Sequence, residues 1–124
     1  MEVFHKDLAY QIMGACFEVH NSMGAGFLES VYQECLEIEL EKRDILYAAQ
    51  ETLAIAYKGQ QLSQKYIPHF IIDQKVILEI KALSNLTPDH RGQTLNYLKA
   101  TGLKLALLVN FGSIDKLESE RLVL

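Results

Sequence analysis

The first third of the chain holds two stretches in which apolar residues recur at the spacing of an α-helix. One runs from about Asp7 to His20, and the next runs from about Phe27 to Arg43. Each stretch lays its apolar residues along one stripe, which is typical of a helix that packs against a core. A polar segment with two glycines, residues 21–26, separates them. The pattern predicts two amphipathic helices joined by a short turn.

The spacing then changes to the two-residue alternation of extended chain. A first strand is predicted over about residues 47–57, before a lysine-glycine turn signal. A second extended segment covers residues 61–72 and is expected to split or bend at Pro68, because proline cannot donate a hydrogen bond inside a sheet. A third, apolar segment covers residues 75–82. These three segments predict the strands of one sheet.

Two opposite charges interrupt the third strand. Side chains alternate between the faces of a strand, so Glu79 and Lys81 share one face with Ile77. Charged groups in a sheet cost free energy unless they are paired, hydrogen-bonded or bound to a metal. Two interpretations compete at this point, an ion pair on an exposed edge strand and a catalytic site.

The turn before this strand decides which residue faces Glu79. If the loop consists of the three residues 73–75, positions that sum to 148 pair across the hairpin, and His69 stands opposite Glu79. A loop of two residues would place these side chains on different faces of the sheet. The sequence alone leaves both loops open.

A third helix is predicted from Thr87 to about residue 100. Thr87 is a good N-cap, and Pro88 occupies the first helical position, where its missing N–H costs nothing. Gln93 and Tyr97 are four residues apart and therefore project from one face of this helix. That face becomes a second candidate for polar chemistry.

The remaining residues complete a single α/β (α+β) domain. Residues 103–111 are apolar on both faces and predict a strand inside the sheet, and residues 112–124 predict a turn and a short terminal strand or helix. The coarse order is α-α-β-β-β-α-β. A chain of 124 residues can bury a core without disulfides or metal, so one domain covering residues 1–124 is expected.

The composition limits the partners. The formal net charge is −4 and the pI is about 5.5, which argues against a surface that grips nucleic acid non-specifically. A nuclease stays possible, because cations bound at an acidic site offset its charge. Cys16 and Cys35 fall in helical apolar stripes and are interpreted as reduced core residues. With no secretory signal and no membrane span, we expect a cytoplasmic protein.

The ordered set of motifs resembles a known family. Residues 26–32, Gly-Phe-Leu-Glu-Ser-Val-Tyr, look like the signature of the GxxExxY family in the PD-(D/E)xK nuclease superfamily. The Glu-x-Lys strand at Glu79 and the Gln-xxx-Tyr helix at Gln93 match the same superfamily. The resemblance covers nearly the whole chain. It implies a restriction-endonuclease-like core, a central mixed sheet flanked by helices.

The resemblance also implies roles for the site residues. Glu79 and Glu29 would be metal ligands, and Lys81 the catalytic lysine that positions the nucleophile or neutralises phosphate charge. Gln93 and Tyr97 would contact the scissile phosphate or orient Lys81. Without the resemblance, Glu29 is simply an acidic residue in the first turn of a helix, where its charge suits the helix dipole. Gln93 and Tyr97 are then ordinary residues of a half-buried helix. Mg²⁺ or Mn²⁺ is the cofactor that the family implies.

One position departs from the family pattern. The pattern usually has an aspartate ten residues before the strand glutamate, and this chain has His69 there. His69 is either a packed, hydrogen-bonded histidine or a surrogate metal ligand beside Glu29 and Glu79. Imidazole in place of a carboxylate should weaken Mg²⁺ binding, whereas Mn²⁺ accepts nitrogen more readily. His20 and His90 lie close to motif residues. We interpret both as surface residues, and a supporting role beside the metal ligands is the less favoured alternative.

Three functions are compatible with these residues. The first is a metal-dependent nuclease that acts on DNA more readily than RNA, weakened by His69. The second is a nuclease-fold module that binds nucleic acid or protein and has lost the chemistry. The third is a structural or oligomeric protein, a homodimer for example, which the acidic pI favours. No membrane partner is expected.

Overall fold

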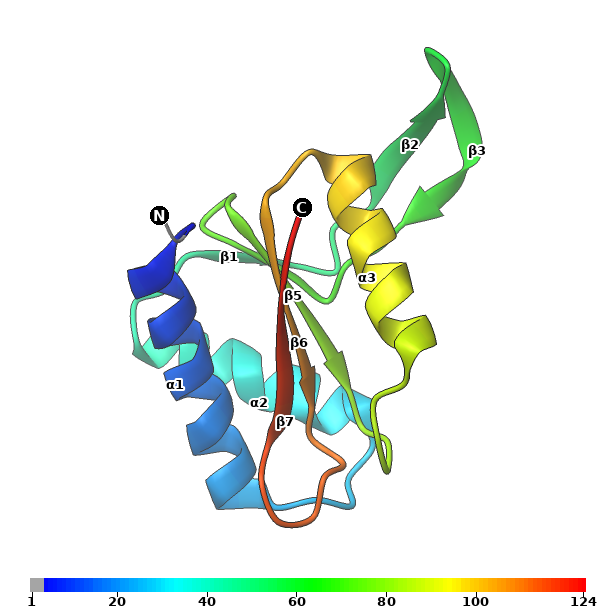
Figure 1. The fold of residues 1–124 in the computed structure, drawn as a ribbon. Helices are drawn as coiled ribbons and strands as arrows, with labels where there is room; N and C mark the ends of the chain where they lie inside the picture. Colours follow the sequence, from blue (N-terminus) through cyan, green and yellow to red (C-terminus); the bar gives the residue numbers. More distant parts are fainter. Residues whose placement is uncertain (1–3) are drawn as a thin grey trace.

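The structure is a computed structural model that describes residues 4–124, in which three helices and seven strands follow one another (Figure 1). The helices are α1 (Lys6–Met23), α2 (Glu29–Lys42) and α3 (Pro88–Thr101). The strands are β1 (Tyr47–Ala49), β2 (Leu53–Tyr57), β3 (Gln60–Tyr66), β4 (Phe70–Ile72), β5 (Val76–Lys81), β6 (Leu105–Asn110) and β7 (Glu118–Val123). The two helices predicted from apolar spacing and the third predicted from its N-terminal signals are all confirmed, with ends that differ by a few residues.

Five strands form one mixed sheet in the order β1-β4-β5-β6-β7. Strands β5 and β6 are parallel, because α3 carries the chain back across the sheet between them, and every other pair is antiparallel. The mixed sheet of a restriction-endonuclease-like core is therefore confirmed. Helices cover both faces of the sheet, since α1 and α2 pack on one side and α3 packs on the other.

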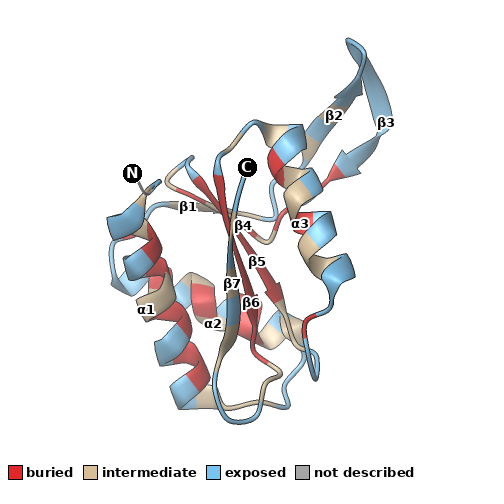
Figure 2. Cartoon of the chain, in the orientation of Figure 1, coloured by how far each residue is buried: buried red, intermediate tan, exposed pale blue. Residues whose placement is uncertain are grey.

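The two faces of β5 bury different residues, as its alternation predicts. Val76, Leu78 and Ile80 join the large core beneath α1 and α2. Ile77 faces α3, where it packs with Leu98 in a much smaller apolar cluster. Figure 2 shows the buried residues concentrated in the sheet and along the inner sides of the helices. Glu79 lies on the α3 face of the sheet, two residues after Ile77.

The segment predicted as one strand over residues 47–57 is two strands in the structure. Gln50 has a positive φ of 53°, which turns the chain out of the main sheet after β1. Strand β2 then pairs only with β3, and these two strands form a separate hairpin. The predicted interruption at Pro68 is confirmed, because it lies between the end of β3 and the start of β4.

The next hairpin has the three-residue loop, one of the two that the sequence left open. Phe70 pairs with Leu78, and Ile72 pairs with Val76, so paired positions sum to 148. The loop closes with a hydrogen bond of 2.9 Å from the Lys75 N–H to the Ile72 carbonyl oxygen. The three-residue loop therefore brings residue 69 to the level of residue 79.

The connection from β5 to α3 is fixed by the end of β6. The Asn110 side chain accepts a hydrogen bond from the Leu83 N–H at 2.8 Å and donates one to the Leu83 carbonyl oxygen at 2.9 Å. Asn110 lies opposite Lys81 in the parallel ladder. This side chain therefore holds the chain just after Lys81 against β6. No helix in residues 4–124 has the length and hydropathy needed to cross a membrane.

Candidate active site

Glu79 is the most deeply buried carboxylate of the site, with a relative exposure of 4%. One of its oxygens accepts hydrogen bonds from the Tyr66 hydroxyl at 2.9 Å and from the His69 backbone N–H at 3.0 Å. The other oxygen lies 2.9 Å from His69 Nδ1. A buried carboxylate costs free energy unless it is paired, and three donors meet that requirement here. Glu79 is not a surface ion-pair partner of Lys81.

His69 joins Glu79 to a second carboxylate. Its Nε2 lies 2.9 Å from Glu29 Oε2, so the imidazole is held between residues of β5 and α2. Both ring nitrogens face carboxylate oxygens, which only accept hydrogen bonds when ionised, so this arrangement favours the protonated, positively charged ring. Burial, the largest single effect, lowers the pKa of His69, but Glu79 and then Glu29 raise it by more, so the net shift is upward.

The backbone of His69 is held from α2 as well. Gln33 follows Glu29 by one helical turn, and its amide nitrogen donates to the His69 carbonyl oxygen at 3.4 Å. The same nitrogen lies 3.3 Å from a carboxylate oxygen of Glu37. Gln33 Oε1 is buried without a hydrogen-bond partner among residues 4–124. Helix α2 therefore supplies both a carboxylate and a backbone support for His69.

Two stacked tyrosines close the α3 side of the site. The rings of Tyr66 and Tyr97 lie 3.6 Å apart between centroids, at 19° to each other. Burial and then the charge of Glu79 raise the pKa of both phenols, while a hydrogen bond with Gln93 offsets part of the shift at Tyr97. Both hydroxyls therefore stay protonated at neutral pH and can act as donors.

Lys81 ends β5 on the same face as Glu79 and is half-buried. Among residues 4–124, the contacts of Glu79 are with Tyr66 and His69, and its carboxylate has no hydrogen bond or ion pair with the Lys81 ammonium. The edge ion pair that its spacing allowed is therefore not formed. The ammonium is left as a cation at the rim of the site.

The three predicted metal ligands come together, but not around one point. Nδ1 and Nε2 point to different sides of the imidazole, so Glu79 and Glu29 are separated by the ring of His69. Within residues 4–124, no three His, Cys, Asp or Glu side chains are arranged to hold one metal ion. In this arrangement the residues do not fit the divalent ion that the resemblance implies. The ligand roles of Glu29, His69 and Glu79 stay predictions.

The other singled-out histidines have structural contacts. His20 is buried, contrary to the surface interpretation, and its Nε2 lies 2.8 Å from the Ser113 carbonyl oxygen. His90 caps α3, because its Nδ1 accepts a hydrogen bond of 3.0 Å from the Thr87 N–H. Thr87 is the N-cap residue, as predicted.

Tyr66 and Gln33 belong to the site and were not predicted from the sequence. Tyr66 is the only buried residue of β3, whose other positions are all exposed. The sequence offered one signal for Tyr66, an aromatic residue at the end of a polar strand and two positions before Pro68. Gln33 lies one helical turn after Glu29. Nothing in the sequence marked its amide as buried or as part of the site.

The whole chain was compared with known proteins. The profile of the PD-(D/E)XK nuclease superfamily matches residues 6–122. Neither the curated proteins nor the solved structures gave a significant match. The matched range includes every residue of the site and every strand of the sheet except the last residue of β7. The chain therefore belongs to the PD-(D/E)XK nuclease superfamily.

Proposed function

We propose that the chain is a DNA nuclease whose phosphodiester hydrolysis is weakened by His69. The observation that carries this proposal is the convergence of Glu29, His69 and Glu79, from α2, the β3–β4 connection and β5, on one hydrogen-bonded centre. Family membership supports a nuclease-type function. A cytoplasmic location is part of the proposal, since both cysteines are free.

Each residue at the rim has a task that its position permits. Lys81 places a positive charge beside the centre, where it would neutralise charge that develops on a phosphate. Tyr97 and Gln93 lie on the face of α3 that borders Tyr66, and their donors would orient a phosphate against Lys81. Three donors already occupy Glu79, and their competition with any other partner of this carboxylate is the physical reason for weak hydrolysis.

Cleavage assays on labelled single- and double-stranded DNA, with Mg²⁺ and with Mn²⁺, test the proposal. H69D restores the residue usual in the family and removes the bridge between Glu79 and Glu29, so its cleavage should be at least tenfold faster than that of the wild type. Wild-type cleavage should be slow with either ion, because both ring nitrogens of His69 are occupied by carboxylates. K81M should reduce cleavage in both backgrounds. Absence of cleavage by the wild type and by H69D in both metals would overturn the proposal.

A second candidate is a DNA-binding module without hydrolysis. It is favoured by the complete pairing of Glu79, which leaves the carboxylate no free role in chemistry. This candidate predicts that the wild type binds DNA and cleaves none, and that E79Q binds with unchanged affinity. Loss of binding in a folded E79Q variant would count against it.

A further inference from the structure

The β2–β3 hairpin stands apart from the body of the protein. Figure 1 shows it projecting beyond the sheet, beside one end of α3. Within the hairpin, residues 53–65 include no buried residue, and only Tyr66 at its base is buried (Figure 2). A two-stranded hairpin is at best marginally stable alone. Its length is therefore not explained by what it adds to the core.

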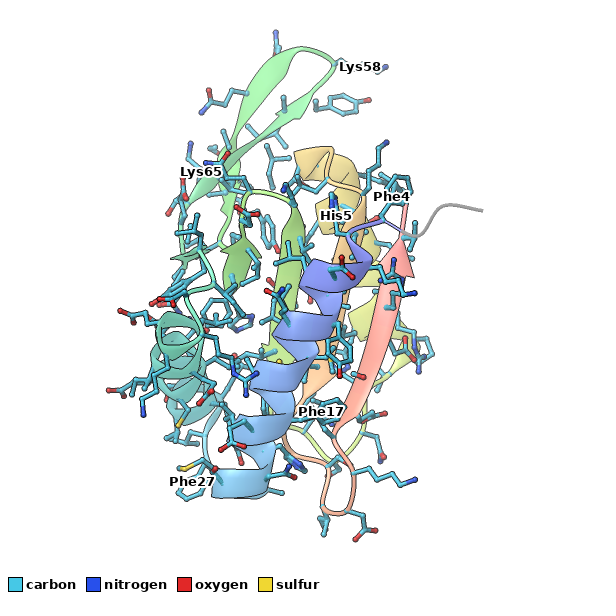
Figure 3. The ribbon with its side chains drawn as sticks, turned by 90° about the vertical axis from the view of Figure 1, so that its left-hand side faces the viewer. Phe4, His5, Phe17, Phe27, Lys58 and Lys65 are labelled. Carbon is cyan, nitrogen blue, oxygen red and sulfur yellow. The ribbon has the colours of Figure 1, made fainter. Side chains whose placement is uncertain are left out.

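The hairpin differs in charge from the rest of the chain. It carries Lys58 and Lys65 and no acidic residue, although the whole chain has twelve basic and sixteen acidic residues. Lys58 lies at the tip of the hairpin and Lys65 lies nearer its base, and both side chains are exposed (Figure 3). Tyr57 is 62% exposed, with the Lys58 ammonium 5.3 Å from its ring centroid. An exposed aromatic ring beside a cation is suited to nucleic acid.

The base of the hairpin is attached to the candidate active site. Tyr66 is the last residue of β3, donates a hydrogen bond to Glu79, and stacks on Tyr97 of α3. The seven residues from Lys65 to the tip span about 20 Å, at roughly 3.3 Å per residue. A DNA strand along the hairpin would therefore pass several phosphates before its backbone reached the site.

We propose that the β2–β3 hairpin is a DNA-binding arm that guides a strand into the site. Lys58 and Lys65 contact backbone phosphates, and Tyr57 stacks on a base. This inference rests on DNA being the ligand in the proposed function. Phosphate is favoured over a hairpin-to-hairpin contact with a second copy of the chain, because the charged residues of the hairpin are all positive and two such hairpins would repel each other.

The test uses fluorescence anisotropy with single- and double-stranded oligonucleotides and the double variant K58N/K65Q. Lys58 and Gly59 form the turn with positive φ values of 48° and 81°, and asparagine-glycine is a preferred pair for such a turn. K58N therefore removes a charge without weakening the hairpin. The matched control is K42Q/K116Q, which removes two exposed lysines outside the hairpin. Circular dichroism checks that both variants are folded.

The proposal expects K58N/K65Q to bind DNA about tenfold more weakly at low salt, with K42Q/K116Q close to the wild type. The slope of log affinity against log salt should become shallower by about 1 to 2, for two lost phosphate contacts. Wild-type binding that K58N/K65Q retains in full would overturn the DNA-binding arm alone. A wild type that binds neither oligonucleotide would overturn the proposed function together with the arm.

Discussion

His69 places an imidazole between two carboxylates, at the position where the resemblance led us to expect an aspartate. A ring whose pKa is raised there takes the place of an expected negative charge. The imidazole lies 2.9 Å from a carboxylate oxygen of Glu79 and of Glu29, so its charge offsets one of the two negative charges from within the chain. At the scale of the residue, the same substitution should stabilise the fold and weaken the chemistry.

The stabilising effect should depend on pH. The pKa of His69 is higher in the folded chain than its ordinary value of about 6.5. The contribution of His69 is therefore fully present below about pH 6.5 and is lost as the pH rises through the raised folded value. We expect the free energy of unfolding of the wild type to decline over that interval.

Urea unfolding of the wild type and of H69Q, measured from pH 5 to pH 9, checks this. Glutamine donates to only one carboxylate at a time, so H69Q should be about 2 kcal/mol less stable at pH 6. Its stability should also change less with pH above 6.5. Parallel pH curves for the two proteins would contradict a charged His69 in the folded state.

At the scale of the element, the approach of β6 to the loop after β5 depends on the absence of a side chain at Gly112. A Cβ at this position would lie 2.2 Å from the Leu83 carbonyl oxygen and 2.5 Å from the Leu83 nitrogen. These are backbone atoms that Asn110 holds in place, so they cannot move aside cheaply. G112A is therefore expected to lower the free energy of unfolding by about 1–3 kcal/mol.

Gly92 provides the matched control for this prediction. It lies inside α3, and a Cβ there would meet no atom within 4 Å. G92A should raise the free energy of unfolding by about 0.5–1 kcal/mol, because alanine is the better helix former. Thermal unfolding of both variants gives the comparison. A stabilising G112A would show that the loop at Leu83 is free to move.

The elements also show what could be predicted from the sequence. Helices and β5 were predictable because their apolar period is a local property. The pairing of His69 with Glu79 could be predicted only as one of two alternatives, because it depends on a loop length that the sequence left open. The separate hairpin was not predictable, since the left-handed turn at Gln50 leaves no mark in the apolar pattern.

The directions of the side chains within the site could not be predicted from the spacing of residues either. The stack of Tyr66 on Tyr97 joins residues far apart in the sequence through packing. The resemblance grouped Glu29, His69 and Glu79 as site residues, and in the structure the His69 ring lies 2.9 Å from a carboxylate oxygen of each glutamate. These three side chains could surround one ion only if the nitrogens of the His69 ring pointed toward it. The orientation of the ring is set by hydrogen bonds between elements that are distant in the sequence.

At the scale of the whole molecule, the two sides of the sheet are unequal. The cluster beneath α1 and α2 has eighteen buried apolar residues, whereas the cluster beneath α3 has Ile77, Leu98 and Ala106. Buried apolar area is the main source of stability, so α3 should detach at a lower free energy than the rest of the fold. Because Gln93 and Tyr97 belong to α3, part of the site would open with it.

Native-state hydrogen exchange with two matched leucine variants tests this asymmetry. Leu36 belongs to α2 and Leu98 to α3, and both side chains are fully buried in the clusters on their own sides of the sheet. L36A weakens the structure that remains when α3 detaches, so it should leave the exchange of α3 amides unchanged and speed exchange in α1, α2 and β5. L98A weakens the native state against both openings and should speed exchange everywhere. Each variant should lose about 2–5 kcal/mol of global stability.

The informative comparison is the α3 amides in L36A. If α3 opens independently, their protection stays at the wild-type value although the global stability has fallen, because native and partly open states lose the same contacts. If these amides lose as much protection as those of β5, then α3 unfolds only together with the sheet. In that case Tyr97 and Gln93 are as rigidly held as Glu79, and the site does not open from the α3 side.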